Sequence, residues 1–287
     1  MRLNTCILLH IVLRGSAREK NFEQRRGCCR LRRERHRAAA PRMSAGMRAP
    51  LSLLPLRLDD IVFAVGSRRI IDGVSVTLEA GRRSVILGPN GAGKSVLLRL
   101  CHGLLTPTSG TVAWNAPEIA GSSRRQAMVF QRPVLLRRTA LGNITYALQL
   151  AGVPFGQRKA RAMEALQQVG LEGHCNHSAR VLSGGEQQRL ALARVWALHP
   201  EILFLDEPTA SLDPGATQEI EKVIAALHAA GTKIVMVTHN LGQARRFGDE
   251  ILFLHQGRLL ERTPSDRFFR NPASSEAAQF LEGELPW

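Results

Sequence analysis

The sequence lacks three features that mark familiar protein classes. No apolar run approaches the ~18 residues of a membrane span, and no internal repeat or low-complexity tract follows residue 50. An odd number of cysteines with no C-x-x-C pair argues against a disulfide framework or a zinc ribbon and favours a reducing, cytosolic compartment. The cysteines are Cys6, Cys28, Cys29, Cys101 and Cys175.

The positive charge of the chain is unevenly distributed. A formal net charge of +15 suggests a nucleic acid or an anionic membrane as partner. Residues 1–50 hold 13 Arg and Lys against 3 Glu, and residues 51–287 hold 26 basic against 21 acidic residues. The larger part of the chain is therefore only mildly basic, and no nucleic-acid partner is expected.

Residues 1–50 are predicted to be a basic, disordered extension of a domain that covers residues 51–287. Their short apolar run precedes the heavy positive charge, which is the reverse of a secretory signal peptide. The first strand-like alternation begins only at Leu56, so Met43 or Met47 could be the true start. A basic arm that contacts RNA or lipid headgroups is the functional alternative.

From Leu56 onward the pattern alternates between strands and helices. RRSVILG, EILFLDE and TKIVMVTH are apolar runs typical of buried parallel strands, TVAW follows a turn, and KSVLLRLCHGLL predicts a helix. No comparable strand occurs from about Arg132 to Leu182, where ITYALQLAGV and RKARAMEALQQVGL predict amphipathic helices, so about 132–195 is expected to be a helical insert. We therefore expect an α/β fold with a parallel sheet and an inserted helical subdomain.

The stretch GPNGAGKS follows a predicted strand and precedes a predicted helix. It matches G-x-x-x-x-G-K-[ST], the phosphate-binding loop, in the context that this pattern requires. Glycines let backbone N–H groups converge on phosphate oxygens, and the helix N-terminus adds partial positive charge. The lysine would neutralise the β- and γ-phosphates, and the serine would ligate Mg²⁺. The predicted nucleotide-binding residues are Gly88, Pro89, Asn90, Gly91, Ala92, Gly93, Lys94 and Ser95.

Two acids end the apolar run ILFLDEP. Asp206 would lie at the carboxyl edge of the sheet, where a magnesium ion beside the phosphate loop needs an oxygen ligand. Glu207 would point elsewhere and accept a proton from the attacking water. Alone, this run could be a strand entering an acidic turn, but together with the phosphate loop it predicts a nucleotide hydrolase.

A second glycine-containing helix start, LSGGEQQRLALA, completes a set of motifs. VFQRP, LSGGEQQRLALAR, DEPTASLDP and VTHN follow one another in an order that resembles the ATP-binding subunits of ABC transporters, over residues 56–262. The resemblance implies an ABC ATPase fold with an antiparallel β subdomain. It also implies that Glu207 polarises the water, that His239 contacts the γ-phosphate, and that Gln131 senses Mg²⁺ and the water.

The same resemblance implies a homodimer. Each phosphate loop would bind ATP in its own chain, and the LSGGEQQR helix start would contact the ATP of the opposing subunit. Asp213 would contact that subunit directly. The residues expected to face the partner's nucleotide are Ser183, Gly184, Gly185 and Gln187.

The chain carries no channel, so the resemblance also implies a transmembrane permease as partner and, through it, a solute-binding protein. The chain would be peripheral, at the cytoplasmic face of the inner (plasma) membrane. The helical insert would face the permease, with Arg132, Arg137 and Arg138 either solvated or meeting polar groups there. ATP would close the dimer and its hydrolysis would reopen it.

The stretches RLCHGLL, AMVFQRPVLLRRTALGNI and AAQFLEGELPW resemble the ATPase subunits of bacterial tungstate importers. Phosphate, molybdate and amino acid importers, or an exporter, are alternatives. A DNA-repair ATPase of this superfamily would insert a long coiled coil between the phosphate loop and LSGG, and a ribosome-associated one would carry two phosphate loops. This chain has neither feature.

Three smaller features remain open at this stage. Adenine normally stacks on an aromatic residue near Val65, and either Phe63 substitutes for it or Phe63 belongs to the core. The HCNH stretch at 174–177 is expected to be a polar loop rather than a metal site, because no distant ligand pair completes it. The aromatic residues of the C-terminal tail, including Phe268 and Phe280, are expected to pack internally.

Overall fold

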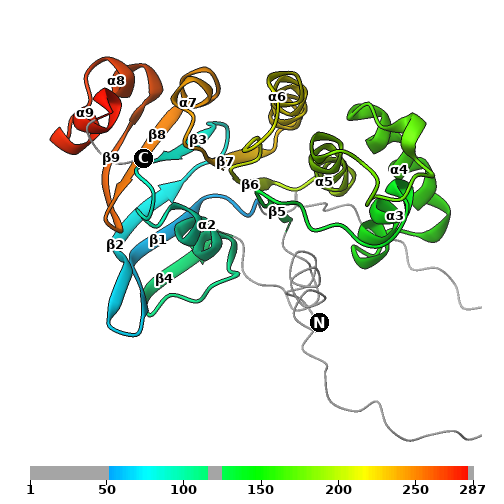
Figure 1. Ribbon diagram of the computed structural model, residues 1–287. Helices are drawn as coiled ribbons and strands as arrows, with labels where there is room; N and C mark the ends of the chain where they lie inside the picture. Colours follow the sequence, from blue (N-terminus) through cyan, green and yellow to red (C-terminus); the bar gives the residue numbers. More distant parts are fainter. Residues whose placement is uncertain (1–51, 116–124, 284–287) are drawn as a thin grey trace, which may run out of the picture.

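A six-stranded sheet forms the centre of the protein in a computed structural model that describes residues 52–115 and 125–283 (Figure 1). The strand order is β5-β6-β7-β3-β8-β9. Neighbouring strands are parallel except at one edge, where β9 pairs antiparallel with β8. The strands are β3 (Ser84–Leu87), β5 (Gln126–Val129), β6 (Ile202–Asp206), β7 (Lys233–Val237), β8 (Glu250–His255) and β9 (Arg258–Pro264).

The central strands are apolar along their whole length because both faces of the sheet are covered. In β6, Ile202 and Phe204 pack into one core cluster, whereas Leu203 and Leu205 pack into the other. Successive side chains of a strand point to opposite faces, so a strand between two layers needs an unbroken apolar run. This is the reason for the runs ILFLD and KIVMV.

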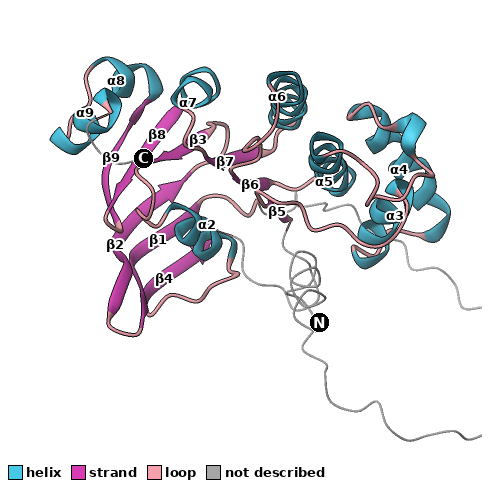
Figure 2. Ribbon diagram, viewed as in Figure 1, coloured by secondary structure: helices cyan, strands magenta, loops and turns pink. Residues whose placement is uncertain are grey.

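One face of the central sheet is covered by a smaller antiparallel sheet and one helix (Figure 2). The small sheet has the order β2-β1-β4 and consists of β1 (Leu56–Val65), β2 (Arg68–Leu78) and β4 (Ser109–Trp114). Helix α2 (Lys94–His102) buries Leu97, Leu98 and Leu100 in the same cluster. This layer holds α2 directly after β3, at the carboxyl edge of the central sheet.

Helices cover the opposite face. Helices α5 and α6 pack against each other, and α3 and α4 pack on α5 (Figure 1). Between β5 and β6 the described chain contains helices, loops and one isolated bridge between Thr139 and Ser178. The helices are α3 (Ala140–Leu150), α4 (Phe155–Gln168), η1 (Glu172–His174), α5 (Gly184–Leu198), α6 (Pro214–Ala229), α7 (Leu241–Phe247), α8 (Ser265–Arg270) and α9 (Ser275–Glu282).

The predicted α/β class with a parallel sheet and an antiparallel β subdomain is confirmed, with local differences. The sequence pattern did not identify β2, whose pairing with β1 contains several register shifts that break its period of two. It also missed the four-residue strand β5. The predicted helix 94–105 ends earlier, at His102, because Gly103 adopts a left-handed conformation with φ of 82° and caps it.

The structure describes both the aromatic C-terminal tail and the HCNH stretch. Phe268 and Phe280 are buried against Phe253, with ring centroids 5.8 and 5.4 Å away, which confirms that the aromatic tail packs internally. The HCNH stretch spans the end of η1 and a turn, and the rings of His174 and His177 meet edge to face.

The predicted extension 1–50 lies outside the described residues. Among the helices that the structure describes, none has the length and apolar character needed to cross a membrane.

Candidate nucleotide-binding site

The loop between β3 and α2 requires glycine at two positions. Gly88 and Gly93 adopt φ of 148° and 100°. A Cβ at Gly88 would clash with the carbonyl of Leu254, and a Cβ at Gly93 would lie 2.8 Å from the carbonyl oxygen of Ile70. Gly93 is also the N-cap of α2 and supplies no capping side chain. The N–H groups at the start of α2 are therefore left without a side-chain acceptor.

Lys94 is positioned at the mouth of this loop. Its ammonium donates to the carbonyl oxygens of Gly88 and Pro89 at 2.7 and 2.9 Å, and the residue is buried. Burial lowers the pKa of Lys94, while the nearby carboxylates of Glu207 and Asp206 oppose this shift. The loop thus presents an ammonium and uncapped backbone N–H groups together, which suits a phosphate chain.

Ser95 and Asp206, far apart in the sequence, meet at the carboxyl edge of the sheet. The Ser95 hydroxyl donates to Asp206 Oδ1 at 2.7 Å, and Asp206 is only 5 % exposed. Burial raises the pKa of Asp206, against the opposing effects of the Ser95 hydrogen bond and the Arg99 charge. A hydroxyl and a buried carboxylate side by side are hard oxygen donors, so these residues fit a magnesium ion.

Glu207 leaves the strand in an unusual conformation. Its φ of 48° lies in the left-handed region, which is strained for a residue with a Cβ. Its N–H donates to the carbonyl of Val237 at 2.9 Å, and its carboxylate lies 3.2 Å from Nδ1 of His239. A cavity of about 210 Å³ adjoins both side chains. The backbone turn thus aims Glu207 away from Asp206 and toward His239.

Gln131 follows the neighbouring strand at the same edge of the sheet. Val129 of β5 lies opposite Leu205 of β6, so Gln131 and Glu207 come two residues later on adjacent parallel strands. Gln131 is exposed. The amide of Gln188 on α5 donates to the carbonyl of Phe130 at 3.3 Å, so α5 contacts the residue just before Gln131.

The second glycine-containing helix start, at α5, caps itself. Ser183 is the N-cap and accepts from the N–H of Glu186 at 3.3 Å, while the Glu186 carboxylate accepts from the Ser183 N–H and hydroxyl, both at 2.8 Å. These hydrogen bonds lower the pKa of Glu186, the backbone one most. The side chain of Gln187 donates to the carbonyl of Leu182 at 2.8 Å. This is a capping box in which Ser183 and Glu186 satisfy each other.

The α5 helix start lines a separate cavity from the phosphate loop. This cavity, of about 390 Å³, is bounded by Ser183, Gly184, Gly185 and Asp213 among others. Asp213 is the N-cap of α6, with its Oδ1 accepting from the Ala216 N–H at 2.8 Å. The predicted site residues thus form two groups, one along the carboxyl edge of the sheet and one at the starts of α5 and α6.

The structure also shows where the two residues considered for stacking on adenine lie. Val65 ends β1 and is 61 % exposed, whereas Phe63 packs against the core cluster beneath the small sheet. Because the carbonyl of Ile70 approaches Gly93, the β1–β2 hairpin adjoins the phosphate loop. Phe63 therefore belongs to the core, and Val65 is the exposed apolar side chain at that end of the hairpin.

Two residues that the sequence analysis did not identify support the site. The guanidinium of Arg99 lies 3.6 Å from Asp206, and its place four residues after Ser95 on α2 could have revealed it. Gln243 is buried, accepts from the Thr238 hydroxyl at 2.8 Å and donates to the Thr209 hydroxyl at 3.0 Å. It thereby links the segments that follow β6 and β7, a contact that no local pattern signals.

Comparisons with known proteins agree with this geometry. The family model described as ABC transporter matches residues 71–210. The tungstate uptake system ATP-binding protein TupC of Peptoclostridium acidaminophilum is 37% identical over 217 residues, 75% of this chain and 100% of that protein. The methionine import ATP-binding protein MetN of Caulobacter vibrioides is 38% identical over 236 residues, 78% of this chain and 71% of that protein.

Solved structures give the same result. An ATP-binding cassette in a dimeric post-hydrolysis state with ADP and Pi is 30% identical, with a TM-score of 0.64 over 73% of this chain and 98% of that one. An ATP-binding subunit of an ABC transporter, 24% identical, shares the fold with a TM-score of 0.70 over 81% of this chain and 100% of that one. The chain therefore belongs to the ATP-binding subunits of ABC transporters, which bind ATP and couple its hydrolysis to transport.

Proposed function

We propose that the protein powers a bacterial importer for tungstate or a related oxyanion. The observation that carries this proposal is the alignment with a tungstate uptake ATP-binding protein over that protein's whole length. A phosphate import ATP-binding protein, PstB 2 of Natronomonas pharaonis, is 35% identical over 82% of its length and also serves a tetrahedral oxyanion. The transported solute itself would contact other subunits, since specificity for it does not reside in an ATPase fold.

The carboxyl edge of the sheet would bind and cleave the nucleotide. Residues Gly88 to Ser95 would hold the phosphates, with Lys94 on the β- and γ-phosphates. Glu207 would accept the proton of the attacking water, and His239, 3.2 Å from it, would contact the γ-phosphate. The strained backbone at Glu207 supports this role, because such strain is retained where a side chain must be aimed.

Magnesium would be held by Ser95 and Asp206, with Gln131 completing the contact from the adjacent strand. The ion would neutralise charge on the β- and γ-phosphates. The contribution of this chain is the buried carboxylate beside a hydroxyl, which is an anionic oxygen set prepared for a small hard cation. Gln131 would report the state of the site toward the helical layer, whose helix α5 contacts Phe130.

A second copy of the chain would complete each site. Ser183, Gly184, Gly185 and Gln187 would face the ATP bound by the opposing subunit, and Asp213 would contact that subunit. The separate cavity lined by Ser183, Gly184, Gly185 and Asp213 supports this arrangement, because no residue of the phosphate loop lines it. ATP would close the dimer, the permease would reorient, and hydrolysis would reset both.

The assembly would include a transmembrane permease and, through it, a solute-binding protein, with this subunit bound peripherally at the cytoplasmic face of the membrane. An amino acid importer is the second candidate, because MetN relatives and a glutamine transport ATP-binding protein from Geobacillus stearothermophilus are 34–39% identical. Both candidates use the same site and differ in the permease.

Solute-stimulated ATPase activity tests the proposal. The chain is reconstituted with a candidate permease and its binding protein, and ATP hydrolysis is measured with tungstate, molybdate, phosphate or methionine. We expect tungstate to stimulate at the lowest concentration, and stimulation by methionine alone would contradict the oxyanion assignment. Deleting residues 1–42 should leave this activity intact. Dependence of the activity on DNA or ribosomes would contradict transport altogether.

A further inference from the structure

One buried glutamine joins the two turns that carry Glu207 and His239. Gln243 lies in the first turn of α7 and is only 1 % exposed. Its Oε1 accepts from the Thr238 hydroxyl at 2.8 Å, and its Nε2 donates to the Thr209 hydroxyl at 3.0 Å. Thr238 directly precedes His239, and Thr209 follows Glu207 by two residues. The relative position of the two turns therefore depends on this amide.

Each of the two turns is closed by its own hydrogen bond. The Thr238 hydroxyl accepts from the Asn240 N–H at 3.1 Å, which closes the chain around His239. The Ala210 N–H donates to the carbonyl of Glu207 at 3.2 Å, which closes the turn after β6. Because each turn is closed, a shift of one turn relative to the other would separate the Glu207 carboxylate from His239 Nδ1, which now lie 3.2 Å apart.

Helix α6 holds the Gln243 amide from a third side. Nε2 of Gln243 also donates to Glu221 Oε1 at 3.0 Å, and the same oxygen accepts from the Arg246 guanidinium at 3.2 Å. An amide nitrogen carries two hydrogens, so it can donate to Thr209 and Glu221 at the same time. A carboxylate at position 243 would instead face the carboxylate of Glu221, and like charges at this distance repel. The position therefore calls for an uncharged side chain that donates twice.

We propose that Gln243 is a positioning residue for ATP hydrolysis, which sets the separation of Glu207 and His239. The inference rests on the proposed function, in which Glu207 accepts the proton of the attacking water. Thr209 and Thr238 line the cavity beside Glu207 and His239, and Gln243 contacts both threonines from the protein interior. A general base must lie within hydrogen-bond reach of the proton that it accepts. A misplacement of about 1 Å can lower the rate about 10²-fold.

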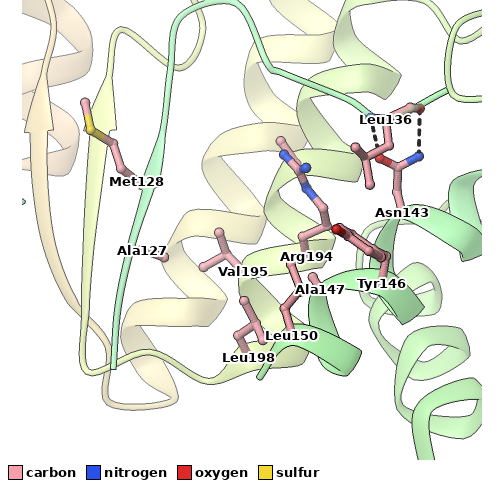
Figure 3. A pocket seen from close by; sticks show the side chains of 11 residues that line it. Ala127, Met128, Leu136, Asn143, Tyr146, Ala147, Leu150, Arg194, Val195 and Leu198 are labelled. Carbon is pink, nitrogen blue, oxygen red and sulfur yellow. Dashed lines mark hydrogen bonds between the residues drawn. The ribbon is translucent and has the colours of Figure 1, made fainter. Parts of the chain in front are cut away.

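Gln243→Met tests the proposal, with Asn143→Leu as the matched control. Each substitution replaces a buried amide with an apolar side chain of similar size. Asn143, on α3 in the helical layer, accepts from the Leu136 N–H at 2.9 Å and donates to the carbonyls of Leu136 and Thr139 at 3.3 and 3.0 Å (Figure 3). Steady-state ATP hydrolysis by the full-length chain gives kcat and KM, and thermal unfolding gives the Tm of each variant.

The two variants should differ in kcat. Gln243→Met should lower kcat about 10- to 100-fold and leave the KM for ATP within about twofold of wild type, because the phosphate loop keeps its contacts. Asn143→Leu should lower the Tm while leaving kcat and KM within about threefold of wild type. An equal loss of kcat in both variants would overturn the proposal, since any lost buried amide would then have the same effect. So would a raised KM with unchanged kcat.

Exchanging the amide and the carboxylate gives a second test. Gln243→Glu sets two carboxylates against each other and should lower kcat about as much as Gln243→Met. Glu221→Gln alone keeps an acceptor for the Gln243 amide and should lower kcat less than about threefold. In the double variant an amide on α6 donates to a carboxylate on α7, so kcat should return to within about threefold of wild type. A double variant as slow as Gln243→Glu would overturn the proposal.

Glu207→Gln separates a failure of this inference from a failure of the proposed function. If Glu207→Gln abolishes hydrolysis while Gln243→Met keeps the wild-type kcat, the positioning role alone is wrong. If Glu207→Gln itself sustains wild-type turnover, Glu207 is not the base, and the proposed role of Glu207 and the positioning role of Gln243 are both wrong.

Discussion

The starts of α2 and α5 are both glycine-containing helix N-termini, yet their N–H groups are treated differently. At α2 the N-cap is Gly93 in a left-handed conformation, which offers no side-chain acceptor. At α5 the N-cap is Ser183, and Glu186 closes a capping box with it. A phosphate approaching α2 meets free donors and Lys94, whereas one approaching α5 meets a carboxylate already in place.

The two helix starts therefore differ in the hydrogen-bond donors that they leave available to a ligand. The α2 start presents Lys94 and backbone N–H groups without a side-chain acceptor, and Ser95, Asp206 and Glu207 lie at the same sheet edge. The α5 start satisfies itself and has only glycine backbone and the Ser183 side chain to offer. Under the proposed function, these groups would contact a nucleotide that another subunit already holds.

Removing the proposed general base while leaving both helix starts intact should cause the largest loss of ATP hydrolysis. Glu207→Gln keeps the size of the side chain that contacts His239 but cannot accept a proton. We expect ATP hydrolysis to fall by about 10²- to 10⁴-fold, with ATP still bound and a closed dimer accumulating. Steady-state ATPase assays and size-exclusion chromatography with ATP measure this, with exposed Glu164→Gln on α4 as the control. Sustained turnover would remove Glu207 as the base.

Blocking only the α5 start should separate hydrolysis from binding. Ser183→Arg places a bulky cation at the helix N-terminus, so we expect ATPase activity to fall by about 10²-fold while the Kd of ATP changes less than about twofold. Ser274→Arg is the control, because Ser274 is also an N-cap, accepting from the Ala277 N–H at 3.3 Å at the distant helix α9. A matching loss of ATP affinity in Ser183→Arg would mean that α5 serves its own nucleotide.

Removing the cation from the α2 start should weaken binding itself. Lys94→Ala deletes the ammonium that the carbonyls of Gly88 and Pro89 position. The Kd of ATP should rise by about 10- to 100-fold, as expected for one or two charge-assisted hydrogen bonds. Titration calorimetry measures this, with exposed Lys222→Ala as the control. Affinity equal to wild type would contradict the phosphate-loop assignment.

The capping box of Ser183 and Glu186 should make a small, pH-dependent contribution to the free energy of unfolding. Hydrogen bonds from Ser183 lower the pKa of Glu186 below its ordinary value of 4.5. The ionised carboxylate therefore stabilises the fold fully above that value, and the stabilisation is lost as pH falls through the lower folded-state pKa. Glu186→Gln should cost about 1 kcal/mol at pH 7, or ~2–4 °C in Tm.

The Tm difference between wild type and Glu186→Gln should shrink as the pH falls below about 4. Thermal unfolding followed by circular dichroism at several pH values measures it. Glu164→Gln, an exposed carboxylate on α4, should show no such trend. A Tm difference that is constant with pH would mean that the charge of Glu186 takes no part in the cap.

Much of the site could be predicted from sequence because its parts lie at the ends of regular elements. The glycines and Lys94 of the phosphate loop, the acids after β6 and the serine before α5 each have a local signature, since backbone conformation and burial period depend on neighbouring residues. The apolar runs likewise indicate a parallel sheet covered on both faces, because only such strands are apolar at every position. The sequence alone thus determined the α/β class and the residues that are predicted to meet phosphate.

Tertiary structure alone decided which of these residues meet. Ser95 contacts Asp206 because β3 and β6 carry them to one sheet edge, and Gln243 joins the segments after β6 and β7 through buried hydrogen bonds. Such contacts depend on how distant elements pack, which no short window of sequence encodes.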